Sequence, residues 1–533
     1  MTNPGFRVYA ALGIIAILSF AIRVLPFIVS GMPYQTDTWP LLRAADDLVA
    51  KTPIPLSAES GFNIEIQWPG TRLFSAVALS VITLPAATLL PILFPLITAL
   101  GVFPLYALVK RMGFSTRPSL FASLLFALSG AEAVISAGVT KEGYAIPLLL
   151  VSLLLLKMAH DSYKPLLSSL LFLVVIMVCG LTHHLTTSVA ILMSTYLLVA
   201  AIFQRGKMRN RLTVGFLLLG TLALAYAASY SFFSQFLGSM GFSALILLLA
   251  LSIAGPFPFL LSAAFNKPLT RLKRVWAVLL FFVSVTVLSA EFFTSLPSGL
   301  HPVPLYLIPA VLPYLAVALL AVLAIVKHAD KFQKSSNIIA IWCFGLLGVL
   351  GFTALVPGMS VYVLRIADFL MLLIAVPAAY ALHRLYSRKR LLPLVILVVV
   401  CAGSAATLPY VAFFSGEFGG SQRTYSQSDI SACSWVGSFA GSSAVYGDIR
   451  YYYIINEYFQ KPVAIYPAYE YFAEGKLEVH SGIFLYYTLM DEIGFQLDMY
   501  GFPLNPGSKS SASDPRLAIC YSNGNAEGRY VLS

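Results

Sequence analysis

Residues 8–48, VYAALGIIAILSFAIRVLPFIVSGMPYQTDTWPLLRAADDL, contain the pattern that decides the fold. Val8 to Val29 is an apolar run of the length that crosses a bilayer as a helix. It leads into Pro33–Leu48, which carries Asp37, the first acidic residue of the chain. The chain has only 23 Asp and Glu, so an acid at a membrane exit is the first place to look for chemistry.

Similar apolar runs of about 20 residues recur along the first 410 positions, and each is long enough to cross a bilayer. Of all residues 59% are apolar and only 11% are charged, whereas soluble domains carry about 25% charge. We therefore expect a polytopic α-helical membrane protein. Arg7 precedes the first run and no small-residue cleavage site follows it, which predicts an uncleaved first span.

Basic residues gather between the apolar runs, almost without acids. Such clusters mark the cytoplasmic side of a membrane protein, and two spans must then lie between neighbouring clusters. The pI is about 9.3, but this placement favours orientation in a membrane and argues against nucleic-acid binding. The clusters are Arg7, 110–117, 157–164, 205–211, 267–274, 327–334 and 384–390.

Under this constraint we predict about thirteen spans, with the N-terminus inside and the C-terminal tail outside. If the apolar run Trp68–Leu84 crossed the membrane, every later basic cluster would lie on the opposite side. It is therefore predicted to lie at the outer interface or to extend the next span. The predicted spans are 8–29, 86–109, 118–136, 144–160, 166–183, 187–204, 212–230, 242–262, 275–292, 303–326, 338–356, 361–382 and 391–411.

The predicted division is a transmembrane domain over 1–411, with a long first outer loop at 30–70, and an outer domain over 412–533. The tail is polar and aromatic and contains no span. Residues 443–466 have the pattern strand, helix, strand, so we expect a small α/β domain there. Two of the cysteines lie in this tail and could pair: Cys433 and Cys520.

The loop after the first span has helical periodicity from Trp39 to Val49. Its apolar face is predicted to lie flat on the membrane, with Arg43, Asp46 and Asp47 turned to water.

Two acids on successive outer loops are the main catalytic candidates. Asp37 can act as a general base towards a hydroxyl or bind a metal, or it can be the N-cap of the helix that follows. Glu142 can be a first-turn residue favoured by the helix dipole, or the second carboxylate of the same site. Because each acid adjoins a span, we expect the two to converge.

Arg365 is the third candidate, because an arginine in an apolar span costs roughly 2.5–3.5 kcal/mol at mid-bilayer. It can pair with Asp368, or its guanidinium can hold a lipid phosphate. His183 and His184 can be metal ligands, but they are more readily explained as groups that make hydrogen bonds at the headgroup level or that line a cavity beneath the first outer loop. Arg23, within the first span, is predicted to extend to the outer headgroups.

The chain resembles the glycosyltransferase C superfamily of integral membrane enzymes, which includes oligosaccharyltransferase catalytic subunits, protein O-mannosyltransferases and aminoarabinose transferases. The resemblance rests on the plan of the chain and on three motifs, PYQTDTW at 33–39, VTKEGY at 139–144 and YVLRIADF at 362–369. It is nearest to archaeal-type oligosaccharyltransferase-like proteins.

The resemblance implies that Asp37 and Glu142 are the acids of the site, either as catalytic groups or as ligands of a divalent metal such as Mg²⁺ or Mn²⁺. It places Lys141 near the donor phosphate and makes Arg365 the residue that holds it. The predicted substrate-binding set is Lys141, Arg365, His183, His184 and Arg72. The tail lacks a WWD-type acceptor motif, which argues against sequon-directed N-glycosylation.

These observations predict a multi-pass glycosyltransferase of the cell membrane with its active site facing outside. It would transfer a sugar, with inversion, from a polyprenyl-phosphate donor to a glycan, lipid or protein acceptor. The alternative is a transporter or flippase of lipid-linked glycans without catalysis. A transporter predicts charges near the bilayer midplane and inverted repeats, and the sequence shows neither.

Overall fold

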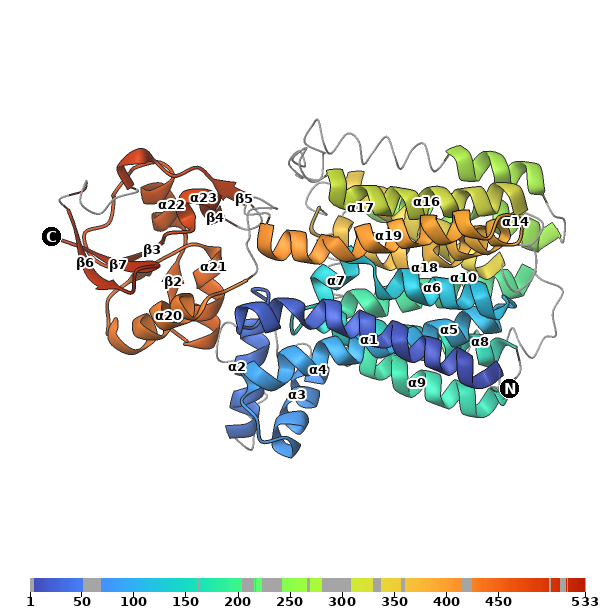
Figure 1. Ribbon diagram of the computed structural model, residues 1–533, viewed down its shortest axis with the longest axis horizontal. Helices are drawn as coiled ribbons and strands as arrows, with labels where there is room; N and C mark the ends of the chain where they lie inside the picture. The colour runs from blue at the N-terminus through green and yellow to red at the C-terminus, as the bar shows by residue number, and fades with distance from the viewer. Residues whose placement is uncertain are drawn as a thin grey trace. The chain divides into compact units, whose positions relative to one another are not determined.

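The computed structural model (Figure 1) describes residues 4–50, 69–161, 163–203, 215, 217–222, 242–265, 269–279, 308–328, 337–355, 360–414, 424–497, 500–508, 514 and 516–532. They form two compact units. The first contains Met1–Ile22, Leu96–Ala133 and Lys141–Thr407, and the second contains Arg23–Pro95, Val134–Thr140 and Leu408–Ser533. The second unit thus joins the tail to two earlier segments of the chain.

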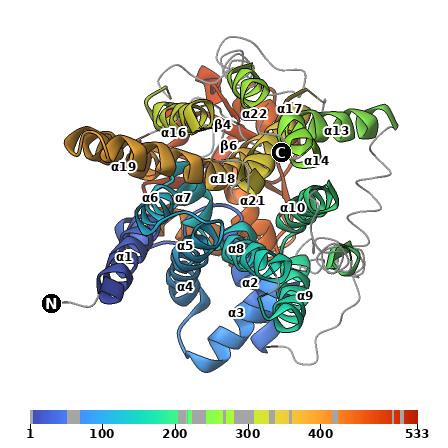
Figure 2. The ribbon, with the colours of Figure 1, turned by 90° about the vertical axis from the view of Figure 1, so that its right-hand side faces the viewer.

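The first unit is a bundle of apolar helices. In lipid every backbone polar group must be satisfied within the protein, and a helix does this locally. Helix α8 packs along α9, and α6 packs along α18 (Figure 1, Figure 2). The helices wholly or partly in this unit are α1 (Pro4–Ser30), α4 (Ala86–Leu100), α5 (Val102–Arg111), α6 (Thr116–Ala127), α7 (Gly130–Ser136), α8 (Lys141–His160), α9 (Pro165–Thr182), α10 (His184–Phe203), α13 (Phe242–Ala254), α14 (Phe257–Phe265), α16 (Ile308–His328), α17 (Asn337–Leu355), α18 (Ser360–Tyr386) and α19 (Leu391–Pro409).

Six helices among the described residues are long and apolar enough to cross a membrane, and the bent pair α6–α7 would make a seventh. The chain is therefore a helical membrane protein, as predicted. The spans predicted at 212–230 and 275–292 lie mainly outside the described residues, so the total of thirteen stays a prediction.

Helices α6 and α7 meet at a bend of 52°, and α7 begins at Gly130, where the chain passes close to α19. A Cβ on this residue would lie 2.3 Å from the carbonyl oxygen of Ser404 and 2.4 Å from Cβ of Thr407, both on α19. Only glycine lets α7 begin this close to α19.

In the second unit, α2 (Thr38–Ala50) follows the first span directly. It contacts α3 (Pro69–Val81) and the π-helical turn η6 (Tyr453–Tyr458). The helix was predicted, but its placement flat on the membrane is wrong, because protein covers its apolar face. The buried residues of that face include Leu41, Leu42, Ala45 and Leu48. Helix α3 has 13 residues, fewer than the about 20 needed to cross, which agrees with the prediction that 68–84 does not span.

The tail contains a five-stranded sheet in the order β2-β1-β3-β7-β6 (Figure 1). β1 is parallel to both β2 and β3, and the other two pairs are antiparallel. Central strand β3 is buried along its whole length, so both of its faces are covered. The strands are β1 (Val445–Tyr446), β2 (Val463–Ala464), β3 (Ile483–Tyr487), β6 (Leu517–Ser522) and β7 (Ala526–Val531); β4 (Phe495–Leu497) and β5 (Tyr500–Phe502) form a separate hairpin.

Short helices connect β1 to β2 and β2 to β3, and residues 443–466 have the predicted order of strand, helix and strand. Cys433 is buried and free, and Cys520 is exposed and free, so the structure does not contain the disulfide considered from the sequence. The remaining elements are η4 (Tyr410–Phe414), α20 (Gln427–Phe439), α21 (Ile449–Tyr452), α22 (Tyr466–Phe472), α23 (Met490–Ile493) and η7 (Pro506–Ser508).

Candidate active site

Glu142 lies in the first turn of α8, where the positive end of the helix dipole favours a carboxylate. Its side chain is only 11% exposed. Pro147, four residues after Gly143, has no N–H to donate to the Gly143 carbonyl. The hydroxyl of Thr98 on α4 donates to that carbonyl instead, at 2.7 Å. The first turn of α8 is thereby tied to a neighbouring helix, which holds Glu142 in place.

His183 lies at the break between α9 and α10, with extended backbone angles (φ −155°, ψ 118°). The backbone N–H of Thr186 donates to its Nδ1 at 3.4 Å, and the Thr186 hydroxyl lies 2.8 Å from the same atom. With Nδ1 accepting, we assign the proton of the neutral ring to Nε2. Nε2 lies 3.2 Å from Oε1 of Glu142 and donates to it.

Arg365 reaches the same carboxylate oxygen from α18. Its NH1 group lies 2.8 Å from Oε1 of Glu142. Helices α8 and α18 and the α9–α10 break therefore converge on one carboxylate within the first unit. Three residues singled out in the sequence, Glu142, His183 and Arg365, are brought together, and we call them the acid–base cluster.

The acid–base cluster places opposite charges among apolar helices. Burying one charge alone is expensive, whereas a paired and hydrogen-bonded charge is tolerated. The Arg365 side chain is 32% exposed, compared with 3% for His183. Arg365 is therefore the member most open to a ligand, and Glu142 and His183 form its buried support.

Lys141 and His184 flank this cluster in the chain. Lys141 is half-buried and begins α8, one residue before Glu142. His184 begins α10, and the ring centroids of His183 and His184 are 5.0 Å apart. Their predicted contacts with a substrate stay predictions.

The turn that carries Asp37 lies in the second unit and is held from both sides. Gln35 is buried, and its side-chain amide donates to the carbonyls of Val134 and Ile135. Its φ of +75° is in the left-handed region, which an L residue adopts only under constraint. The Thr38 hydroxyl donates to the Tyr34 carbonyl at 2.5 Å and accepts from the N–H of Val139 at 3.0 Å.

Gly138 lets the two segments approach this closely. A Cβ there would lie 2.7 Å from the Tyr34 carbonyl oxygen and 3.0 Å from Oγ1 of Thr38. The backbone around Asp37 is therefore defined by buried contacts, while Asp37 itself is exposed. It immediately precedes the first residue of α2, which is the N-cap position considered from the sequence.

Asp37 belongs to the second unit and Glu142 to the first, so their predicted convergence stays a prediction. Arg72, on α3, donates to the carbonyl of Ala44 at 3.0 Å and so ties α3 to α2. This contact gives Arg72 a structural role, and its predicted role in substrate binding stays untested.

Arg23 does not extend to the headgroups, contrary to the sequence-based prediction. Its side chain is buried, and Nε donates to the Ser136 hydroxyl at 2.9 Å. The hydroxyl lies on the same segment that holds Gln35, which explains why the guanidinium stays inside the protein.

The strain at Gln35 gives a test of how the Asp37 turn is built. Gln35→Ala loses the two hydrogen bonds and keeps the left-handed backbone, whereas Gln35→Gly loses the same bonds but removes strain worth about 1 kcal/mol. We expect thermal unfolding of the purified protein in detergent to rank wild type above Gln35→Gly, and Gln35→Gly above Gln35→Ala. Equal stability of the two variants would contradict the constrained backbone.

No family model and no curated protein sequence matches the chain. Solved structures do match. The oligosaccharyltransferase of Archaeoglobus fulgidus, tethered to an acceptor peptide with the NVT sequon, aligns over 92% of this chain and 70% of its own, at 13% identity and a TM-score of 0.59. The archaeal oligosaccharyltransferase AglB of the same organism, in complex with an inhibitory peptide and a dolichol-phosphate, aligns over 90% and 69%, at 14% identity and a TM-score of 0.59.

The chain has the archaeal oligosaccharyltransferase fold. The predicted resemblance to archaeal oligosaccharyltransferases is thereby confirmed for the fold. ArnT from Cupriavidus metallidurans also aligns, over 99% of this chain and 98% of its own at 12% identity, but a TM-score of 0.38 is too low to support further comparison.

The side chains that the structure describes around Glu142 do not suit a divalent metal. Oε1 already accepts from Arg365 and His183, and a guanidinium at 2.8 Å would repel a divalent cation. Within the described ranges, no three His, Cys, Asp or Glu side chains are grouped so that they could hold a metal. We therefore derive no step through Mg²⁺ or Mn²⁺.

Two residues that support the candidate side chains were not identified from the sequence. Thr186 sets the proton position on His183, and its only signal is a threonine three residues after a histidine at a helix break. Gln35 supports the Asp37 turn through a left-handed backbone, and no sequence pattern marks a glutamine for that conformation.

Proposed function

We propose that this chain is a membrane glycosyltransferase that takes a sugar from a polyprenyl-phosphate donor and passes it to an acceptor on the outer face. The fold supports the class, since it is shared with a protein solved in complex with dolichol-phosphate and with peptides. The observation that carries the proposal is the acid–base cluster, because it presents an arginine, fixed by a buried carboxylate, within a bundle of apolar helices.

A guanidinium matches phosphate oxygens in geometry and keeps its charge at every physiological pH. In the proposal Arg365 holds the donor phosphate. Glu142 acts in the site by orienting Arg365 and His183 rather than as a free base, because both groups already donate to Oε1. Lys141 and His184 would contact the phosphate from the starts of α8 and α10.

The proposed reaction is a single displacement with inversion. An acceptor hydroxyl attacks the anomeric carbon, and the bond from that carbon to the phosphate oxygen breaks. The hydroxyl proton passes to Asp37, and the electron pair leaves with the polyprenyl phosphate, whose developing charge Arg365 stabilises. The acceptor is a hydroxyl on a glycan, lipid or protein.

The proposal is tested by transfer of radiolabelled sugar in membranes that contain the wild-type chain, with a panel of polyprenyl-phosphate sugars as donors. We expect label to move from at least one donor to an acceptor and polyprenyl phosphate to be released in equal amount. If no donor on a broad panel is consumed, and labelled lipid-linked glycan instead crosses the membrane intact, the transporter alternative replaces this proposal.

A further inference from the structure

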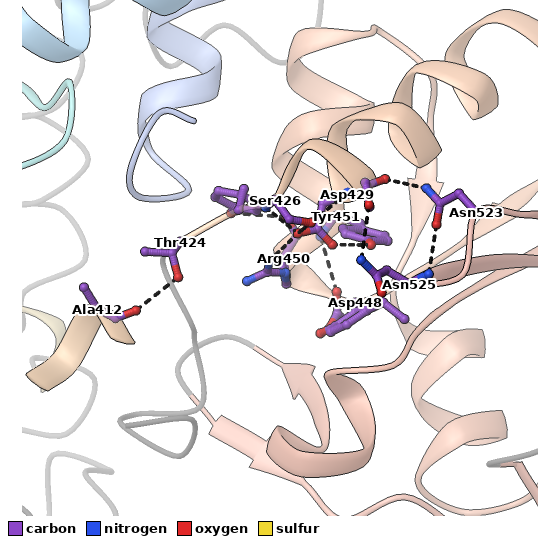
Figure 3. A network of polar contacts seen from close by, with 12 residues as sticks. Ala412, Thr424, Ser426, Asp429, Asp448, Arg450, Tyr451, Asn523 and Asn525 are labelled. Carbon is purple, nitrogen blue, oxygen red and sulfur yellow. Dashed lines mark hydrogen bonds and ion pairs between the residues drawn. The ribbon is translucent and has the colours of Figure 1, made fainter. Parts of the chain in front are cut away.

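Among the residues that the structure describes, five arginines stack on a tyrosine ring, and three of them also pair with a carboxylate. The pair in the tail is the most deeply buried (Figure 3). The central carbon of Arg450 lies 4.5 Å from the ring centroid of Tyr425, and its NH2 group lies 2.8 Å from Oδ2 of Asp429. The other two pairs are Arg111 with Asp161 and Arg529 with Glu527.

The two exceptions are Arg117 and Arg384, both in the first unit. The central carbon of Arg117 lies 5.1 Å from the ring centroid of Tyr386, and that of Arg384 lies 5.4 Å from the ring centroid of Tyr380. Within the described ranges, neither guanidinium pairs with a carboxylate. Arg117 is exposed and Arg384 is half-buried, so both can be reached by a ligand.

These two arginines come from neighbouring helices and share a neighbour. Arg117 lies in the first turn of α6 and Arg384 in the last turn of α18, and the two helices pack along each other. The charges of both arginines act on the ring of His383, so the two guanidinium groups lie around one side chain. Like charges held near each other repel, and an anion that binds beside both of them relieves that repulsion.

The tyrosine rings prepare the two guanidinium groups for a phosphate. Stacking restricts the plane of each guanidinium, and Nε of Arg384 also donates to the Tyr380 hydroxyl at 2.9 Å. A planar guanidinium matches the oxygens of a phosphate, and less conformational entropy is lost on binding when the group is already oriented. The chemistry that fits this surface is therefore a phosphate group.

The surroundings favour a lipid as the source of that phosphate. The basic clusters predict that this end of α18 is cytoplasmic, and α18 is followed after a short turn by α19, which begins at Leu391. Leu391 is 75% exposed, and Val395 and Val398 further along α19 are 48% and 64% exposed. A phospholipid carries its phosphate at such a boundary between basic and apolar surface, whereas a soluble phosphate would use only the basic part.

We propose that Arg117 and Arg384 bind the headgroup phosphate of an anionic phospholipid, whose acyl chains lie along the apolar surface that begins at Leu391. Arg384 follows Arg365 by nineteen residues on α18, so the two are separated by roughly 28 Å along the helix. Lipid binding at this end of α18 involves no transfer step. The inference therefore goes beyond the proposed function and can fail independently of it.

The experiment uses the purified full chain in detergent, freed of lipid, with phosphatidylglycerol as the anionic probe and phosphatidylcholine as the probe without net charge. Binding of the first lipid is measured by native mass spectrometry, and the melting temperature is measured with and without lipid. The test variant is Arg117→Gln/Arg384→Gln. The matched control, Arg388→Gln/Arg390→Gln, removes the same two charges from exposed residues of the next turn.

We expect phosphatidylglycerol to bind wild type and the control variant equally and to raise the melting temperature of both, because a ligand that binds only the folded state stabilises it. The Arg117→Gln/Arg384→Gln variant should bind it at least tenfold more weakly, and phosphatidylcholine should bind all three proteins weakly. The proposal is overturned if the test and control variants bind phosphatidylglycerol equally, since overall charge would then explain binding, or if wild type does not distinguish the two lipids.

The test variant loses the bond between Arg384 and Tyr380 and could melt early for that reason. In that case Arg117→Gln is compared with Arg388→Gln, and the same two outcomes decide. Inorganic phosphate at millimolar concentration separates the sources of the ligand: retention of the lipid supports the proposal, and displacement assigns the site to a soluble phosphate and overturns it. Sugar transfer by a wild-type protein that does not select the anionic lipid would refute this inference and leave the proposed function standing.

Discussion

Asp37→Asn is expected to abolish sugar transfer, with a loss of at least about 100-fold, because the amide cannot take the proton of the attacking hydroxyl. The substitution keeps the size of the side chain, and Asp37 is exposed, so the fold should be unaffected. The measurement is the initial rate of transfer from the donor that wild type uses, in membranes with matched amounts of protein.

Asp47→Asn is the matched control for Asp37→Asn. It makes the same chemical change ten residues further on, where Asp47 pairs with Arg43 on the surface of α2 at 3.1 Å. Surface pairs of this kind contribute at most about 1 kcal/mol, so this variant should keep full activity. A folded Asp37→Asn protein that transfers at the wild-type rate would remove Asp37 from the mechanism, and the search for the base would move to another acid.

Arg365→Gln is expected to lower transfer by about 100-fold or more, because the phosphate loses its clamp in both the ground state and the transition state. The variant also leaves the Glu142 carboxylate without its cationic partner. Removing one member of a buried pair costs about 3–5 kcal/mol, and the cost here should be nearer 2 kcal/mol because Arg365 is 32% exposed. Loss of activity alone would therefore not separate a catalytic role from a structural one.

The double variant Glu142→Gln/Arg365→Gln makes that separation. With both charges removed, the two amides can hydrogen-bond to each other, and most of the lost stability should return. Transfer should stay as low as in the single variant, and in both variants the KM for the donor should be higher than in wild type. Recovery of transfer together with stability would show that Arg365 serves the fold and does not hold the phosphate.

The composition and spacing of the sequence were sufficient for the fold class. The apolar runs and the basic clusters between them predict membrane helices, because a backbone in lipid has few other ways to satisfy its polar groups. The helical segment at 39–49 and the strand–helix–strand order at 443–466 were also predicted from local patterns. These properties depend on residues close together in the chain, so they can be derived without knowledge of the packing.

Helix α2 shows what a local pattern cannot predict, namely what covers an apolar face. The sequence analysis predicted that the apolar face of α2 lies on the membrane. Protein covers that face instead, including Leu41, Leu42, Ala45 and Leu48, and α2 contacts α3 and η6. An amphipathic pattern states that a face must leave water, but lipid and protein satisfy that need equally well. Arg23 is the same case for a polar group, since the identity of its partner, Ser136, depends on a segment 113 residues away.

The sequence by itself determined that this protein is a helical membrane protein and named Glu142, His183 and Arg365 as candidates. The membrane helices and the candidacy of Arg365 follow from the free energy of placing residues in lipid, whereas Glu142 and His183 were singled out by their residue type and their place beside predicted spans. Only the tertiary structure decided that these three side chains meet at one carboxylate oxygen, that Gln35 supports the Asp37 turn, and that Arg450 and Asp429 form a buried ion pair in the tail. Such contacts join residues 21 to 223 positions apart, and local patterns carry no information on which distant side chains pack together.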